Sequence, residues 1–156
     1  MADNFGEVAI NALANVLGHT QGVGTVLRRS LNQTDANGAL GICLDKWEPL
    51  DFEMGVPGFM EPTLSQWVFS VQHMVKHVNQ EDGEAVHREV AKAVRLMLYR
   101  DPEVQVSLRS LYVVEDGRRE RFQRFRVTDQ RYASNEIKGT FVFLSVTELV
   151  IETETV

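Results

Sequence analysis

Histidines are the residues of this chain most able to carry chemistry, and two of the four stand close together. His73 and His77 are four positions apart, a spacing that places both side chains on one face of a helix and suits zinc. Their segment is rich in β-branched and aromatic residues, and its more apolar side chains occupy every second position, which predicts a strand. In a strand the two Cα atoms lie roughly 13 Å apart. They then cannot bind one ion, and we expect histidines at the core edge or at an interface.

The other possible catalytic residues also favour a structural interpretation. His87 stands beside Arg88 and Glu89 on a predicted helix, so we expect it on a solvent-exposed face. Cys43 lies in a short apolar run, which is typical of a small buried cysteine. The glycines at 22 and 24 follow a helix rather than a strand and lack the Lys-Ser or Lys-Thr pair of a phosphate loop. We therefore expect no enzyme, no metal and no cofactor.

An arginine-rich segment is the strongest local charge feature of a chain whose formal net charge is -6. Residues 118–131 hold six arginines and two carboxylates, a local charge of +4. Three interpretations stay open: a surface for a protein partner or another copy, a solvated strand paired to glutamates of a neighbouring strand, or a nucleic-acid contact. The acidic remainder and the scarcity of interleaved aromatic residues disfavour nucleic acid. The glutamates available for pairing are Glu148, Glu152 and Glu154.

Strand geometry makes a finer prediction about these arginines. The sequence Asp116-Gly117 is a short hairpin signal, so the first arginines lie near the tip of a long two-stranded arm. Simple alternation divides the arginines between the two faces of the strand. Arg119 and Arg121 are predicted on one face, and on the other Arg118, Arg124 and Arg126.

Residues 45–61 form a stretch of different character, which we interpret as a long acidic loop carrying exposed aromatic residues. It contains five carboxylates, one lysine, two prolines and two glycines. Aromatic and methionine anchors inside a polar rim are typical of a binding surface. The predicted subunit or partner interface therefore combines this loop with the hairpin tip: Trp47, Phe52, Met54, Phe59, Met60, Arg118, Arg119 and Arg121.

Length, composition and periodicity predict the fold. The chain has 156 residues, 44% hydrophobic and 24% charged, as in a globular protein with a single domain over 1–156. No apolar run approaches the ~20 residues that span a bilayer, so we expect no membrane contact. The fold class is α+β: a mostly antiparallel sheet with a long hairpin arm, packed by N-terminal helices and one central amphipathic helix. We predict helices at 4–17, 23–31, 84–100 and 101–108, strands at 39–44, 63–78, 111–115, 118–131 and 140–153, and a turn at 134–136.

Several segments resemble one family of viral proteins. They are 47–50 (Trp-Glu-Pro-Leu), 61–64 (Glu-Pro-Thr-Leu), 94–102 (Val-Arg-Leu-Met-Leu-Tyr-Arg-Asp-Pro), 126–127 (Arg-Val) and 141–149 (Phe-Val-Phe-Leu-Ser-Val-Thr-Glu-Leu). From about residue 47 onward, the chain is similar to the tail terminator proteins of long-tailed, siphovirus-type bacteriophages, particularly those of actinobacteria. These are patterns of fold and style rather than catalytic signatures.

This resemblance implies a structural protein of the virion. A hexameric ring would cap the last ring of the tail tube, stop its polymerisation and join the tail to the head-completion, or stopper, proteins. The partners implied are other copies of the chain and the tail tube protein, and DNA would only pass through the lumen. The place implied is the head–tail joint of a virion assembled in the host cytoplasm.

Three other functions remain open from the sequence. The first is a head–tail connector or tail-completion protein of the same joint, and the second is a small cytoplasmic binding module unrelated to viruses. The third is an enzyme with a histidine-dependent site. Ring formation separates the viral functions from the binding module, and a bound metal or a reactive Cys43 would favour the enzyme.

Overall fold

The computed structural model describes residues 4–50, 64–100, 102–115 and 117–155. Helices and strands occur in an order close to the predicted one. The elements are α1 (Phe5–Leu17), β1 (Val26–Leu27), β2 (Leu40–Pro49), β3 (Leu64–His77), α2 (Gln80–Arg100), α3 (Pro102–Arg109), β4 (Tyr112–Glu115), β5 (Arg118–Ile137) and β6 (Thr140–Thr155).

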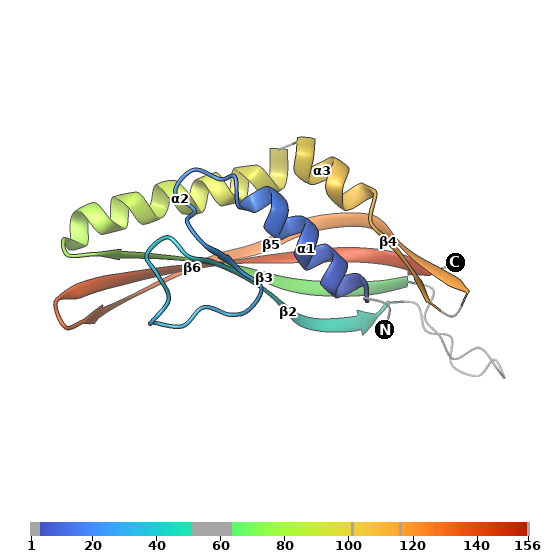
Figure 1. Cartoon of the computed structure of the whole chain (residues 1–156), viewed down its shortest axis with the longest axis horizontal. Helices are drawn as coiled ribbons and strands as arrows, with labels where there is room; N and C mark the ends of the chain where they lie inside the picture. Colours follow the sequence, from blue (N-terminus) through green and yellow to red (C-terminus); the bar gives the residue numbers. More distant parts are fainter. Residues whose placement is uncertain (1–3, 51–63, 101, 116, 156) are drawn as a thin grey trace.

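The strands form one sheet in the order β1-β2-β3-β6-β5-β4. Only the short β1–β2 pair is parallel, and the other neighbours are antiparallel. The three helices lie along one side of this elongated sheet (Figure 1). We call the side under the helices the helix face, represented by Trp67, Phe69 and Val71, and the other side the far face. The predicted α+β class with a mostly antiparallel sheet is confirmed.

The core lies between the helices and the central strands. Leu13 of α1, Leu98 of α2 and Leu108 of α3 are fully buried in one cluster with Phe69 of β3 and Ile151 of β6. Burying each such side chain stabilises the fold by about 1.5–3 kcal/mol. The helices thus fix the central strands, and the outer strands extend from this core.

Strand β6 is central, as its apolar residues on both faces predict. It pairs with β3 on one side and β5 on the other. Phe143 faces the helices and is 3% exposed, whereas Leu144 lies half-buried on the far face. These neighbouring side chains thus lie on opposite faces of the strand, and only Phe143 is fully covered.

The predicted helix at 23–31 is wrong, because this segment crosses the end of the sheet in an extended conformation. Leu40 donates its backbone N–H to the carbonyl of Thr25, and Gln72 accepts the N–H of Leu31 at 2.8 Å. A Cβ at position 41 would lie 2.5 Å from the carbonyl oxygen of Arg29, so Gly41 permits the close passage of this chain. Contacts to the sheet outweigh the weak helical pattern of a short segment.

The predicted turn at 134–136 lies inside β5, and the chain reverses later. Lys138 and Gly139 have φ angles of 50° and 81°, and Ile137 pairs with Thr140 across the turn. Two consecutive residues with positive φ are typical of a type I′ hairpin, which matches the right-handed twist of the strands. The β5–β6 arm is therefore longer than the sequence pattern indicates.

Candidate interaction surfaces

Trp47 lies on a strand and not in a loop as predicted, because β2 continues to Pro49. It pairs with Trp67 across the sheet, their ring centroids are 6.2 Å apart, and the Trp47 side chain is 45% exposed. Trp67 in turn contacts Phe5 of α1 at 5.9 Å. Trp47 is therefore an exposed aromatic residue fixed to the core at the edge of the sheet.

Most of the predicted acidic loop lies outside the described residues. Positions 45–49 belong to β2, and within it Asp45 occupies a bulge and accepts a hydrogen bond from the hydroxyl of Ser70. The predicted interface residues of the remaining segment stay predictions: Phe52, Met54, Phe59 and Met60.

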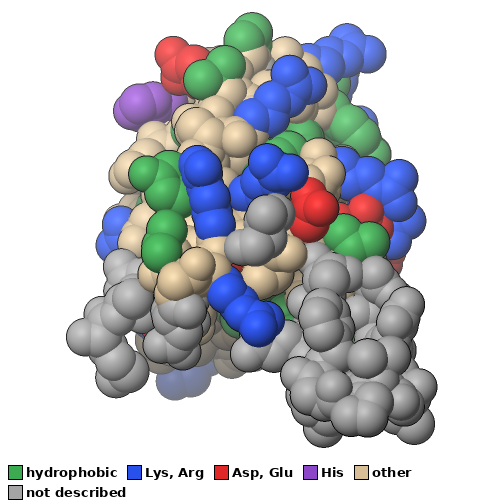
Figure 2. All heavy atoms as spheres, turned by 90° about the vertical axis from the view of Figure 1, so that its right-hand side faces the viewer, with side chains coloured by type: hydrophobic (Ala, Val, Ile, Leu, Met, Phe, Trp, Pro, Cys, Tyr) green, Lys and Arg blue, Asp and Glu red, His purple; other side chains and the backbone are tan. Residues whose placement is uncertain are grey.

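Strands β4 and β5 pair as the predicted hairpin requires, and the first arginines lie on β5 beside the short strand β4. The guanidinium carbon of Arg119 is 4.3 Å from the centroid of the Tyr112 ring, a cation–π contact. Arg121 pairs with Glu154 at 3.1 Å, and Arg118 lies opposite Glu115 in the register. Figure 2 shows this end of the molecule, where several basic side chains lie among exposed hydrophobic ones. The surface combines cationic and aromatic groups.

The predicted division of the arginines between two faces is wrong beyond Arg121. The pairing with β6 shifts between Phe122 and Arg124, which leaves Gln123 as an extra residue. A bulge of this kind reverses the alternation that follows it. Arg124 and Arg126 therefore share the far face with Arg121, opposite Glu152 and Val150 respectively.

Glutamates of β6 pair with part of this arginine row. Arg124 forms an ion pair and a second hydrogen bond with Glu152, and the guanidinium lowers the pKa of that carboxyl. Together with the Arg121–Glu154 pair, this shows for two arginines the cross-strand pairing of the solvated-strand interpretation. Exposed pairs contribute about 0–1 kcal/mol each, so they orient the side chains more than they stabilise the fold.

The structure does not unite the two halves of the predicted interface. Trp47 lies on the helix face of β2, whereas Arg119 and Arg121 lie on the far face at the other side of the sheet. Strands β3 and β6 separate them. A single copy therefore presents the aromatic residue and the arginines at opposite edges, where they can meet only between copies or on a partner.

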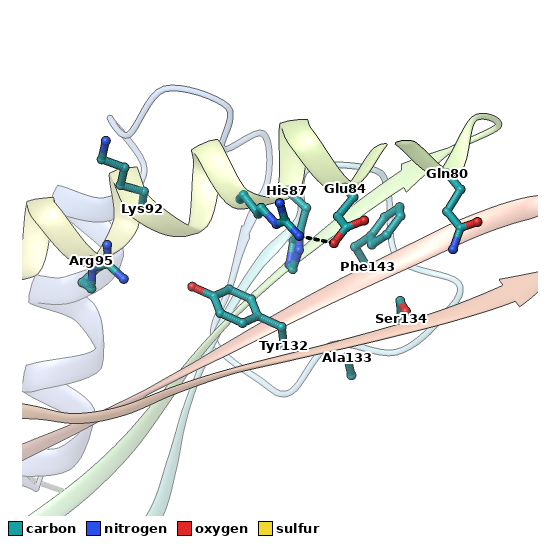
Figure 3. A pocket seen from close by; sticks show the side chains of 10 residues that line it. Gln80, Glu84, His87, Lys92, Arg95, Tyr132, Ala133, Ser134 and Phe143 are labelled. Carbon is teal, nitrogen blue, oxygen red and sulfur yellow. Dashed lines mark hydrogen bonds and ion pairs between the residues drawn. The ribbon is translucent and has the colours of Figure 1, made fainter. Parts of the chain in front are cut away.

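A cleft between α2 and the β5–β6 arm was not expected from the sequence. It has a volume of about 550 Å³, and Figure 3 shows His87 reaching from α2 toward Tyr132 and Phe143. Its lining is rich in charged and polar groups: Gln80, Glu84, His87, Arg88, Lys92, Arg95, Tyr132, Ala133, Ser134 and Phe143.

His87 is buried, contrary to the prediction of a solvated histidine. It is 3% exposed, its ring stacks on Phe143 at 5.7 Å, and Tyr132 meets it edge-on at 5.6 Å. Its charged neighbours in the sequence, Arg88 and Glu89, face water instead. The helical spacing Gly83, His87, Val90, Val94 gives the signal that finds this face, because these positions form one buried stripe.

Burial determines the charge state of the inner histidines. Desolvation, followed by the proximity of His73, lowers the pKa of His87 to about 4. Desolvation likewise lowers the pKa of His73, which is 1% exposed on β3. The Nε2 atom of His87 has no hydrogen-bond partner in the described part of the chain. Both histidines are therefore neutral at pH 7.

Comparisons with known proteins include a distant likeness to a solved structure. No protein-family model and no curated protein matches the chain. Among solved structures, a chain of the "Virion of native gene transfer agent (GTA) particle" is similar, with 13% sequence identity and a TM-score of 0.35. The match covers 90% of this chain and 84% of that chain. A similarity this low carries no argument about function.

The described residues contain neither a metal-binding cluster nor a membrane-spanning helix. Within these ranges, no group of three or more His, Cys, Asp or Glu side chains is arranged to hold a metal ion. The helices seen in the same ranges are all too short or too polar to cross a membrane.

Proposed function

We propose that this chain is a structural virion protein: a tail terminator that forms a closed hexameric ring on the tail tube. The observation that carries the proposal is the pair of unlike edges of the sheet. One edge is β2 beyond its short contact with β1, and the other is formed by β4 and the arginine-rich start of β5 with which it pairs. Unlike edges on opposite sides of one subunit suit head-to-tail contacts, which close into rings.

The side chains at these edges are complementary. Trp47 is half-exposed at the β2 edge, and at the other edge Arg119 and Tyr112 form an exposed cationic and aromatic pair. An arginine beside a tryptophan of the next copy would gain a cation–π contact of about 0.5–2 kcal/mol. A stable contact of this kind buries on the order of 1,000 Å² or more.

The resemblance to tail terminators supplies the rest of the proposal. It implies that the partners are the tail tube protein and the head-completion proteins. It also implies that DNA passes through the lumen and that the location is the head–tail joint. The unlike edges support ring formation, and the family resemblance supports the position of that ring.

A tube-growth experiment tests this function. Purified tail tube protein should stop lengthening when the wild-type chain is added, and Trp47→Ala should weaken this arrest. The matched control is Val78→Ala, which also truncates an exposed apolar residue but lies beyond the His77 end of β3, at the opposite end of the strand from Trp67, the partner of Trp47. Tubes that lengthen equally with and without the wild-type protein would contradict the function.

A further inference from the structure

The outer side of β5 exposes a long run of strand without a neighbour. β4 pairs only with Arg118–Arg121 and, in the described part of the chain, no other strand follows on that side. Every residue from 131 to 136 is exposed. Unpaired N–H and C=O groups of such an edge can pair with an added strand.

Bulges interrupt one half of this β5 edge, whereas the strand is regular along the other half. The two bulges of β5 fall at 122–124 and 127–129, where they interrupt the pairing with β6. From Asp129 to Ile137 the register advances without interruption. Bulges are a common means of preventing unwanted strand pairing. The regular half lacks that protection and retains the geometry that a further strand needs.

Hollows flank this regular half on both faces of the sheet. The cleft beneath α2 lies on the helix face, and a smaller groove of about 240 Å³ lies on the far face. Ala133 and Ser134 line both of them. Consecutive side chains of a strand point to opposite faces. A strand added at this edge would therefore place its side chains alternately into the cleft and into the groove.

The two hollows differ in chemistry. The cleft carries Arg88, Lys92 and Arg95 against one acid, Glu84, and in the described part of the chain Lys92 forms no ion pair. His87, whose buried Nε2 atom has no hydrogen-bond partner among the described residues, also lines it. The groove is mainly apolar, with Leu31, Met74, Val142 and Leu144 among its residues. The cleft thus suits acidic side chains and the groove apolar ones.

We propose that β5 between Gln130 and Glu136 is a strand-addition site for an extended peptide segment of another protein, with alternating acidic and apolar side chains. Backbone hydrogen bonds along the edge supply affinity, and the two hollows supply specificity. The proposal rests on the edge and the hollows alone, and is independent of the ring and of the tail tube.

A peptide titration tests this site on the free subunit. The probe is a short labelled peptide in which aspartate alternates with leucine, followed by fluorescence anisotropy. A peptide of equal composition with all aspartates first should bind at least about tenfold more weakly, because only the alternating order serves both hollows. Lys92→Glu should weaken the alternating peptide by about tenfold or more. Arg28→Glu, an equal charge change at an exposed position that lines neither hollow, should leave its binding unchanged.

Backbone methylation distinguishes strand addition from side-chain docking. Two alternating peptides are methylated on alternate amides, so that each keeps the N–H groups of one edge only. Binding should be lost for one methylated peptide and kept for the other, and amide hydrogens at 130–136 should exchange more slowly with the unmodified peptide. No binding of the alternating peptide, or equal binding of both methylated peptides, would overturn the proposal. Tube arrest is measured separately, so either failure is recognised on its own.

Discussion

The indole Nε1 of Trp67 donates a hydrogen bond to Glu120, 53 positions later in the chain, over 3.0 Å. The same Glu120 oxygen accepts the hydroxyl of Thr153 at 2.6 Å. Trp67 and Thr153 lie on neighbouring strands and are both buried. Hydrogen bonds therefore connect Glu120 of β5 to two buried residues, one on β3 and one on β6.

Replacing Glu120 should remove these two hydrogen bonds and lower the stability of the fold. Glu120→Ala removes the acceptor that Trp67 and Thr153 share. Trp67 keeps a hydrogen bond to the Thr153 hydroxyl at 3.2 Å, whereas the buried Thr153 donor is left unsatisfied, which costs about 1–3 kcal/mol. Chemical denaturation should show a loss in that range, with a smaller loss for Glu120→Gln, which keeps an acceptor oxygen. The control is Glu136→Ala, an exposed position of the same strand. Equal stability of Glu120→Ala and wild type would show that the hydrogen bonds of Glu120 contribute nothing to the free energy of unfolding.

Gly83 should resist a substitution that normally strengthens helices. Glycine inside a helix costs about 1 kcal/mol relative to alanine. Here, however, an added Cβ would lie 2.6 Å from Phe143 Cε2 and 2.7 Å from His77 Cβ. We predict that Gly83→Ala lowers the melting temperature, whereas exposed Glu89→Ala on the same helix changes it little. A higher melting temperature for Gly83→Ala would contradict the close contact of α2 with the sheet.

His87 should make the fold less stable as the pH falls. Its folded pKa of about 4 lies below the usual value of 6.5, so the fold favours the neutral ring. The titratable groups that act on it are His73 and Glu84, together with the charged Arg88. Stability is then full above about pH 6.5 and declines toward pH 4, by roughly 2 kcal/mol at pH 5.

Denaturation at a series of pH values measures this effect. His87→Phe removes the titrating group and keeps a flat ring against Phe143, so its stability should fall less between pH 7 and pH 5 than that of wild type. The same change at exposed His19 should leave the wild-type slope. Parallel curves for wild type and His87→Phe would show that His87 does not titrate as its burial predicts.

Periodicity predicts the parts of this fold that the core determines. The helix at 5–17, the strand at 64–77 and the central β6 were all expected, because each repeats apolar residues at the period of its structure. The extended course of 23–31 was not, since it depends on a close approach at Gly41 that has no sequence period. The inner position of His87 follows a helical stripe that its charged neighbours obscure.

The arginine faces show a second limit of sequence patterns. Alternation correctly places Arg119 and Arg121 on one shared face, but a single extra residue at Gln123 moves Arg124 and Arg126 to that same face. No turn residue marks this bulge in the sequence. The candidate interface could therefore be located on the chain, while its shape depended on pairing that only the structure shows.

We predict that the arginine hairpin binds protein and not DNA. The change Arg119→Glu with Arg121→Glu removes the contact with Tyr112 and places like charge opposite Glu154, but both side chains are exposed, so the subunit should stay folded. Joining of heads to tails should be impaired, and retention on heparin or DNA resin should not change as it would for a dedicated DNA site. Micromolar binding of duplex DNA at physiological salt, lost in the double variant, would assign the strand to DNA instead.

In the proposed closed ring at the end of the tail tube, each contact joins two unlike edges of neighbouring copies. The most direct measurement is electron microscopy of tail tubes assembled with the wild-type protein, with copies counted in the averaged density of the capped end. We predict six copies arranged head to tail, with the β2 edge of one against the β4–β5 edge of the next. One copy or three at the tube end, or contacts that join like edges, would contradict it.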